Sequence, residues 1–170
     1  MAQQAIREKI FKVLQRGALL CRKRNSFDQL VVPALSLVDV SEDTMRAKFS
    51  LEVTQEMCHW EGVMHSGMIS TLIGNATALH GGCCDKDERA VTSTDLNLSF
   101  INIAGIGEIV QIESHLLKLG QRACLAEAHV TSKDGAKVVA AGRHTMIFTG
   151  AKGSGVALSE HETHRGLDYL

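Results

Sequence analysis

Histidine and cysteine side chains cluster in the middle of this sequence, and both residue types bind zinc in proteins. His80, Cys83 and Cys84 lie within five residues of one another, and Cys58 and His59 lie upstream. Adjacent cysteines are poor ligands for tetrahedral zinc, and the usual spacing of two residues between paired cysteines is absent. We therefore expect no metal site at these residues.

The cysteine count also indicates a redox compartment. The chain has five cysteines, an odd number, with no Cys-x-x-Cys pair and no secretory signal. This pattern is typical of an intracellular protein whose thiols are reduced and either buried or incidental.

Length and composition restrict the class of protein. The 170 residues are 45% apolar and 22% charged, with a formal net charge of −1 and one proline. These values fit one globular domain with tails, rich in regular structure, and exclude wholesale disorder. The balanced charge excludes general attraction to nucleic acid. No apolar run approaches the roughly 18 residues of a membrane span.

The small net charge hides a basic N-terminal segment. Residues 1–24 hold seven bases and one acid, a net of +6, which leaves 11 bases and 18 acids, a net of −7, for the other 146 residues. Apolar residues recur between these bases at near-helical spacing, at Ile6, Ile10, Val13, Leu14 and Leu20. The pattern predicts an amphipathic helix over 2–23. We interpret it as a surface helix packed on the domain, with a mitochondrial targeting segment as the alternative.

The hydropathy pattern then predicts strands around one further helix. Residues 35–40 and 45–53 alternate like two strands of a hairpin that turns at 41–43. From His65 to His80 the pattern is helical and rich in small residues, and Gly81-Gly82 is predicted to cap this helix. Four antiparallel strands are predicted to follow, at 92–100, 108–119, 123–132 and 137–148.

This order predicts an α+β domain in which the central helix covers one face of an antiparallel sheet. We divide the chain into a basic N-terminal helix at 1–30, a domain at 31–149 and a flexible tail at 150–170. The tail holds four glycines and few bulky apolar residues.

Four short motifs within this pattern resemble a known family. They are His65-Ser66-Gly67, Ser93-Thr94-Asp95-Leu96-Asn97, Leu117-Lys118-Leu119-Gly120 and Ala141-Gly142-Arg143-His144-Thr145. Together with the element order over residues 35–148, they resemble the hotdog-fold acyl-coenzyme A thioesterases, in the branch of the phenylacetate-degradation proteins.

The resemblance implies a hotdog fold, in which the sheet wraps around the central helix. Two subunits of such proteins join their sheets, the active sites lie at the dimer interface, and dimers pair into tetramers. The implied reaction is hydrolysis of an acyl-CoA to a free acid and coenzyme A, with no metal or redox cofactor. The implied partners are an acyl-CoA and further copies of the chain, with no nucleic acid and no transmembrane segment.

The resemblance also assigns roles at the start of the central helix. The backbone N–H groups of Ser66 and Gly67 would polarise the thioester carbonyl, because free N–H groups and the positive end of a helix dipole stabilise an oxyanion. His59 stands where the family has an asparagine that supplies a second donor. Ser93 matches the strand serine that positions water.

Gly74 is the main departure from the family, because it occupies the position of the acidic residue that activates water. His59 is our preferred replacement, since an imidazole titrates near neutral pH. Glu61 in the same loop is the second candidate. Asp95 is the third, because strand alternation puts it on the same face as Ser93.

Further positions match substrate-binding residues of the family: His65, Asn75, Lys118, Gly120, Arg122 and Arg143. The resemblance puts the three cations near the coenzyme A phosphates, which suit such charges.

Three hypotheses of function follow from these residues. The chain is a working thioesterase whose base comes from a new position, an acyl-CoA-binding protein with weak or no hydrolysis, or an assembly module without a ligand. The cytoplasm is the favoured location, with the mitochondrion as the alternative if the basic helix is a targeting segment.

Overall fold

The computed structural model describes residues 2–43 and 45–154. Of the tail predicted at 150–170, residues 155–170 lie outside the described part. The secondary structure runs α1 (Ala2–Arg24), η1 (Phe27–Leu30), β1 (Ser36–Ser41), β2 (Arg46–Glu52), η2 (Gln55–Met57), α2 (Ser66–Cys84), β3 (Ala90–Phe100), β4 (Ile109–Leu119), β5 (Ala123–Ser132) and β6 (Val138–Thr149).

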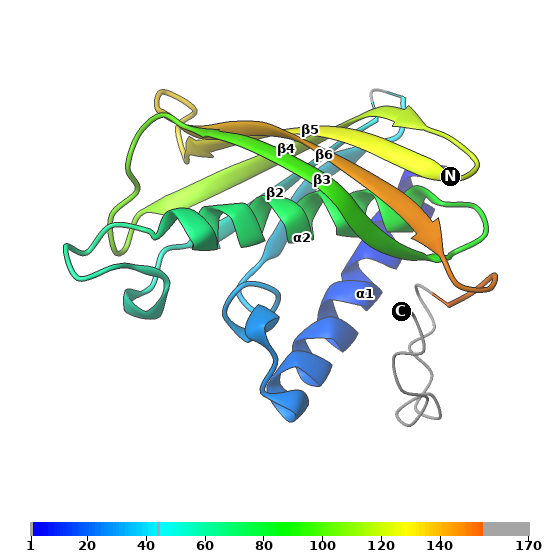
Figure 1. The fold of residues 1–170 in the computed structure, drawn as a ribbon, viewed down its shortest axis with the longest axis horizontal. Helices are drawn as coiled ribbons and strands as arrows, with labels where there is room; N and C mark the ends of the chain where they lie inside the picture. The colour runs from blue at the N-terminus through cyan, green and yellow to red at the C-terminus, as the bar shows by residue number, and fades with distance from the viewer. Residues whose placement is uncertain (1, 44, 155–170) are drawn as a thin grey trace.

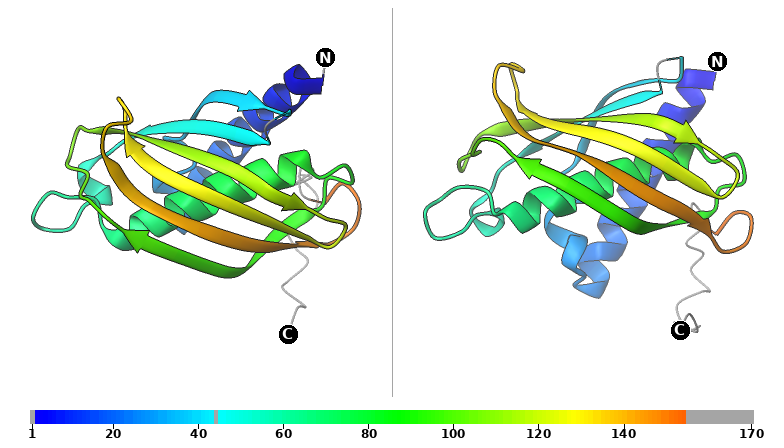
Figure 2. Two further views of the ribbon diagram at one scale, coloured as in Figure 1. Left: turned by 90° about the horizontal axis from the view of Figure 1, so that it is seen from above. Right: turned by 45° about the horizontal axis from the view of Figure 1, so that its top comes forward.

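The six strands form one antiparallel sheet in the order β1-β2-β4-β5-β6-β3. The sheet curves over α2, and α1 lies beyond α2 on the same side (Figures 1 and 2). Alternate residues of β4, from Val110 to Leu116, are buried against α2. Phe49 and Ile112 from the sheet and Leu72 and Ile73 from α2 fill the core between them. The predicted α+β architecture with an additional N-terminal helix is confirmed.

Helix α1 packs on the domain through its apolar stripe. Ile10 and Leu14 are buried, and Gln3 donates a hydrogen bond to the Val40 carbonyl at 2.7 Å. Lys9 forms an ion pair with Glu88 at 3.1 Å. No helix in the described part of the chain is long and apolar enough to cross a membrane.

The predicted end of the central helix is wrong, because α2 continues through Gly81-Gly82 to Cys84. Both glycines are packing positions rather than caps. A Cβ on Gly81 would lie 3.1 Å from the Cys124 sulfur, and one on Gly82 would lie 3.1 Å from a Val91 methyl. The helix ends at Cys84, and Asp85 is its C-cap, whose N–H donates to the carbonyls of Gly81 and Gly82.

Strand β3 forms one edge of the sheet, and a β-bulge interrupts its pairing with β6 between Ser93 and Asp95. Ser93 pairs with Met146, which faces α2, whereas Asp95 pairs with Thr145 on the other face. The prediction that Asp95 shares a face with Ser93 is therefore wrong, because the bulge inserts one residue and reverses the alternation.

Candidate active site

The N-terminus of α2 presents one unpaired backbone donor. His65 is the N-cap, and its Nδ1 accepts the Gly67 N–H at 3.0 Å. The N–H groups of Met68 and Ile69 donate to the His65 carbonyl at 2.8 and 3.0 Å. Among the described residues, the Ser66 N–H is therefore the one donor of this first turn without a partner. It points from the positive end of the helix dipole.

His59 lies in the turn that leads into this helix. The turn is closed by a bridge between Cys58 and Met64. The Nδ1 of His59 accepts the Glu61 N–H at 3.1 Å, and its ring lies edge-on to Trp60 with ring centres 5.5 Å apart. Nε2 is the ring nitrogen left for a ligand, and the Glu61 carboxylate lies 4.0 Å from Nδ1.

A group of three polar side chains, Ser93, His144 and Thr77, lies further along α2, where the inward face of the sheet meets the helix. Ser93 Oγ on β3 lies 2.8 Å from His144 Nε2 on β6. His144 Nδ1 lies 2.6 Å from the Thr77 hydroxyl of α2, which donates to the Ile73 carbonyl at 2.7 Å. His144 is 1% exposed, while Ser93 is exposed on the edge strand. Burial lowers the pKa of His144, although the charge of Asp95 acts in the opposite direction.

Gly74 lies one turn before Thr77 on α2, next to this group. A Cβ at Gly74 would meet no atom within 4 Å. The space that a carboxylate side chain would enter is therefore open, and the Thr77 hydroxyl lies 3.2 Å from the Gly74 carbonyl.

Asn75 faces a different direction. Its side-chain nitrogen donates to the Asp28 carboxylate at 2.9 Å and to the Thr71 carbonyl at 3.0 Å. These bonds join α2 to the segment after α1, and Asn75 lines a small apolar cavity there with residues of α1. The structure thus gives Asn75 a role in holding η1 to α2.

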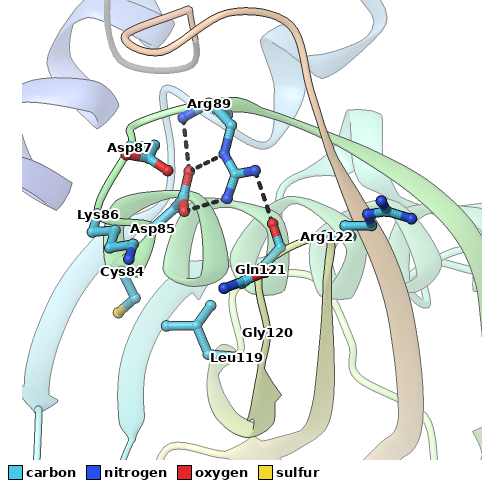
Figure 3. Close-up of a pocket in the computed structure, with 9 residues that line it drawn as sticks. All are labelled: Cys84, Asp85, Lys86, Asp87, Arg89, Leu119, Gly120, Gln121 and Arg122. Carbon is cyan, nitrogen blue, oxygen red and sulfur yellow. Dashed lines mark hydrogen bonds and ion pairs between the residues drawn. The ribbon is translucent and has the colours of Figure 1, made fainter.

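The end of β4 and the turn to β5 line two cavities and carry two of the three predicted phosphate-binding cations, Lys118 on β4 and Arg122 in the turn. Lys118, Gly120 and Arg122 line a cavity of about 350 Å³. Gly120 and Arg122 also line a neighbouring cavity of about 670 Å³ (Figure 3). Arg143 lines neither of them, and its guanidinium lies 3.6 Å from Glu127.

Arg89 lines the larger of these two cavities, and its guanidinium is already bound by neighbouring residues. It binds the Asp85 carboxylate and donates to the Gln121 carbonyl at 2.8 Å (Figure 3). Its guanidinium also lies 4.7 Å from the centre of the Phe148 ring. The charges of Lys86 and Arg122 at this cavity have no ion-pair partner within the described residues.

The histidines and cysteines considered as zinc ligands have other surroundings. His80 is buried beside the Ser114 hydroxyl at 3.0 Å, and burial lowers its pKa to about 4. Burial raises the pKa of Cys83 to about 12 and of Cys84 to about 11, so both thiols stay protonated at neutral pH. Cys58 donates to the Thr54 carbonyl at 3.3 Å.

Comparisons with known proteins identify the family. The sequence model of the Thioesterase superfamily matches residues 61–139, which contain the N-terminus of α2 and Ser93. The human protein named acyl-coenzyme A thioesterase 13 is 30% identical over 95 residues, which cover 56% of this chain and 67% of the human protein. The chain belongs to the thioesterase superfamily.

Solved structures with the same fold agree with this membership. The PaaI protein of the Escherichia coli phenylacetic acid degradation operon superposes with a TM-score of 0.65 at 15% identity, covering 84% of this chain and 96% of PaaI. A hypothetical thioesterase from Streptococcus pneumoniae, solved with coenzyme A, gives a TM-score of 0.63 at 15% identity, covering 74% and 96% of the two chains. The predicted hotdog fold is confirmed, and the PaaI protein shares it.

Sequence reasoning missed two residues of this thioesterase-superfamily chain, Thr77 and His144. In the sequence, His144 stands out only as part of the motif Ala141-Gly142-Arg143-His144-Thr145. A usable signal was present: it alternates with Gly142 and Met146 on a strand, so it had to face the helix, and a buried histidine requires polar partners. Thr77 lies one turn after Gly74 and is the polar residue of α2 that contacts His144.

Proposed function

We propose that this chain hydrolyses an acyl-CoA thioester to a free acid and coenzyme A. The observation that carries the proposal is the unpaired Ser66 N–H at the start of α2, in a chain of the thioesterase superfamily. A fixed donor at a helix N-terminus stabilises the charge that develops on a carbonyl oxygen under attack. The name of the human relative, an acyl-coenzyme A thioesterase, supports the substrate class.

We propose that Ser66 supplies the main oxyanion donor and that His59 supplies the second through Nε2. In this arrangement His65 holds the first turn by accepting the Gly67 N–H, so Gly67 supports the site rather than binding substrate. Water is the nucleophile, and the reaction needs no metal or redox cofactor.

The proposed site requires two copies of the chain. Ser66 and Thr77 are eleven residues apart on α2, which corresponds to about 16 Å along the helix axis. One thioester carbonyl cannot contact the Ser66 N–H and a water held by Ser93 across that span. The edge position and exposure of β3 support a dimer in which β3 of a second copy brings its Ser93 to the Ser66 of the first. Pairing of two dimers into a tetramer is the larger assembly we propose.

Coenzyme A is proposed to bind at the turn between β4 and β5. Lys118 and Arg122 offer positive charge beside a cavity, on a domain that is otherwise acidic. The pneumococcal protein solved with coenzyme A supports this class of ligand for the fold.

A single substitution tests the role of the helix terminus. Ser66 is the first helical residue, where proline is tolerated because its missing N–H leaves no helical bond unmade. The preceding residue, His65, has φ −64° and ψ 137°, which are also compatible with a following proline. Ser66→Pro therefore deletes the donor and preserves the helix, while Ser66→Ala keeps the N–H.

We expect thiol release from at least one of a set of short-chain, long-chain and aryl acyl-CoAs. Ser66→Pro should lower kcat by about 100-fold or more, and Ser66→Ala should leave it within a few-fold of the wild type. Equal rates for the two variants would contradict the proposed donor.

Gly74 favours a second candidate function, acyl-CoA binding without efficient hydrolysis, because the residue that activates water in related enzymes is missing. Calorimetric titration with a non-hydrolysable thioether analogue of acyl-CoA separates the two functions. Saturable binding without thiol release from any acyl-CoA would support the second candidate. If the chain shows neither binding nor thiol release, the remaining hypothesis is a hotdog assembly module without a ligand.

A further inference from the structure

We infer that Ser93 and His144 together perform the proton transfer that a carboxylate at position 74 performs in related enzymes. This inference rests on the proposed function and names the residues that activate water. Ser93 is the residue that contacts the water, and His144 is a positioning residue that acts through it.

We assign the imidazole proton of His144 to Nδ1 from the hydrogen bonds around the ring. The Thr77 hydroxyl has one proton and donates it to the Ile73 carbonyl at 2.7 Å. Towards His144 Nδ1, 2.6 Å away, this hydroxyl therefore acts as the acceptor, and Nδ1 carries the hydrogen. The lone pair of Nε2 then faces Ser93, whose hydroxyl donates across 2.8 Å. Ser93, His144 and Thr77 thus form a hydroxyl, a base and a third group that orients the base. Enzymes use this arrangement to activate a hydroxyl by removing its proton.

The surroundings of His144 favour a neutral imidazole that can accept a proton. Burial lowers its pKa below the usual value of 6.5, and Asp95 on β3 raises it in part. The neighbouring strand β5 places Ala126 opposite His144, and α2 presents the uncharged Thr77. Asp95 lies on the outer face of β3, where its negative charge stabilises the imidazolium formed during transfer without contacting Nε2.

The step balances without any further reactant. Water attacks the thioester carbon, and a new C–O bond forms while a water proton passes to Ser93 Oγ. At the same time the Ser93 proton passes to His144 Nε2, and the oxyanion is held by the Ser66 N–H of the partner copy. Collapse of the intermediate breaks the C–S bond. The thiolate of coenzyme A leaves with the proton returned from His144 through Ser93, so that acid and thiol are the products.

The geometry of Gly74 gives a direct test by replacement. Its Cβ position is open, so Gly74→Asp restores the missing carboxylate without a clash. The measurements are kcat and KM for thiol release, and the pH profile of kcat/KM, for Ser93→Ala, His144→Gln, Gly74→Asp and the double variant His144→Gln with Gly74→Asp. His129→Gln is the matched control, because this histidine is exposed on β5.

We expect Ser93→Ala and His144→Gln each to lower kcat by about 100-fold or more, with little change in KM. In the wild type, kcat/KM should decrease at acidic pH as His144 becomes protonated, which gives the pH profile an acidic limb. In the double variant, activity should recover at least tenfold over His144→Gln, and the acidic limb should move to the lower pH at which a carboxylate is protonated. A merely structural histidine would give neither the recovery nor the moved limb.

Two results would overturn the inference while leaving the proposed function intact. One is an active His144→Gln variant with an unchanged acidic limb. The other is an active Ser93→Ala variant, which has its substitution at an exposed strand edge and so serves as the test if His144→Gln fails to fold. A wild-type chain that releases no thiol from any acyl-CoA would overturn both the proposed function and this inference.

Discussion

Arg89 binds the carboxylate of Asp85 through two parallel side-chain hydrogen bonds, at 2.8 and 3.0 Å, and its own backbone N–H adds a third at 3.0 Å. Asp85 is 4% exposed and follows the last residue of α2. A carboxylate at a helix C-terminus is disfavoured by the helix dipole. Arg89 offsets that cost and joins the end of α2 to the start of β3.

Replacing Arg89 with methionine should therefore destabilise the protein strongly. The substitution keeps most of the side-chain volume but leaves the Asp85 carboxylate, which is 4% exposed, without the cation that pairs with it. Urea denaturation at pH 7 measures the free energy of unfolding. Lys133→Met, at an exposed turn, is the control and should change it by less than about 0.5 kcal/mol. A loss of similar size in both variants would contradict the importance of the pair.

The same pair predicts how stability depends on pH. The side-chain hydrogen bond from Arg89 is the main cause of the lowered pKa of Asp85. Because the folded-state pKa lies below that of the unfolded chain, about 3.9, this stabilisation is fully present above that value. It is lost as the pH falls through the folded-state pKa. The difference in unfolding free energy between wild type and Arg89→Met should thus be constant from pH 5 to 7 and shrink at lower pH. A difference independent of pH would show that packing, not charge, is responsible.

The secondary structure could largely be predicted from the sequence, because its causes are local. Alternation of apolar and polar residues defined all six strands, and apolar spacing between bases defined α1. The end of α2 could not be predicted. Gly81-Gly82 has the composition of a helix cap, and only the close approach of Cys124 on β5 and Val91 on β3 shows why small residues are favoured there within the helix.

The candidate site could be predicted only in part for the same reason. The helix N-terminus at Ser66 follows from a local motif. The orientation of Asp95 depends on a bulge that the sequence of β3 does not reveal, and His144 meets Ser93 and Thr77 only through pairing between distant elements. The family resemblance groups Arg143 with Lys118 and Arg122, whereas in the structure Arg143 lies beside Glu127.

Two glycines of α2 should respond to alanine in opposite directions. At Gly74 a Cβ would meet no atom within 4 Å, so Gly74→Ala should stabilise the protein by about 0.5–1 kcal/mol through its higher helix propensity. At Gly81 the Cβ would lie 3.1 Å from the Cys124 sulfur, and overpacking should cost about 1–3 kcal/mol. Thermal unfolding of the two variants provides the comparison. Equal shifts would contradict the close packing of α2 on β5.

Removing the cations at the turn between β4 and β5 should weaken coenzyme A binding without slowing the chemical step. Lys118→Gln and Arg122→Gln each remove one charge beside the smaller cavity, and the double variant should raise the KM for acyl-CoA by about tenfold with kcat unchanged. The wild-type KM should rise with ionic strength, and that dependence should be weaker in the double variant, because salt screens the lost attraction. Lys133→Gln is the control for a general change in net charge. A wild-type KM and salt dependence in the double variant would place the coenzyme A phosphates elsewhere, and Arg143→Gln would then be the next variant to measure.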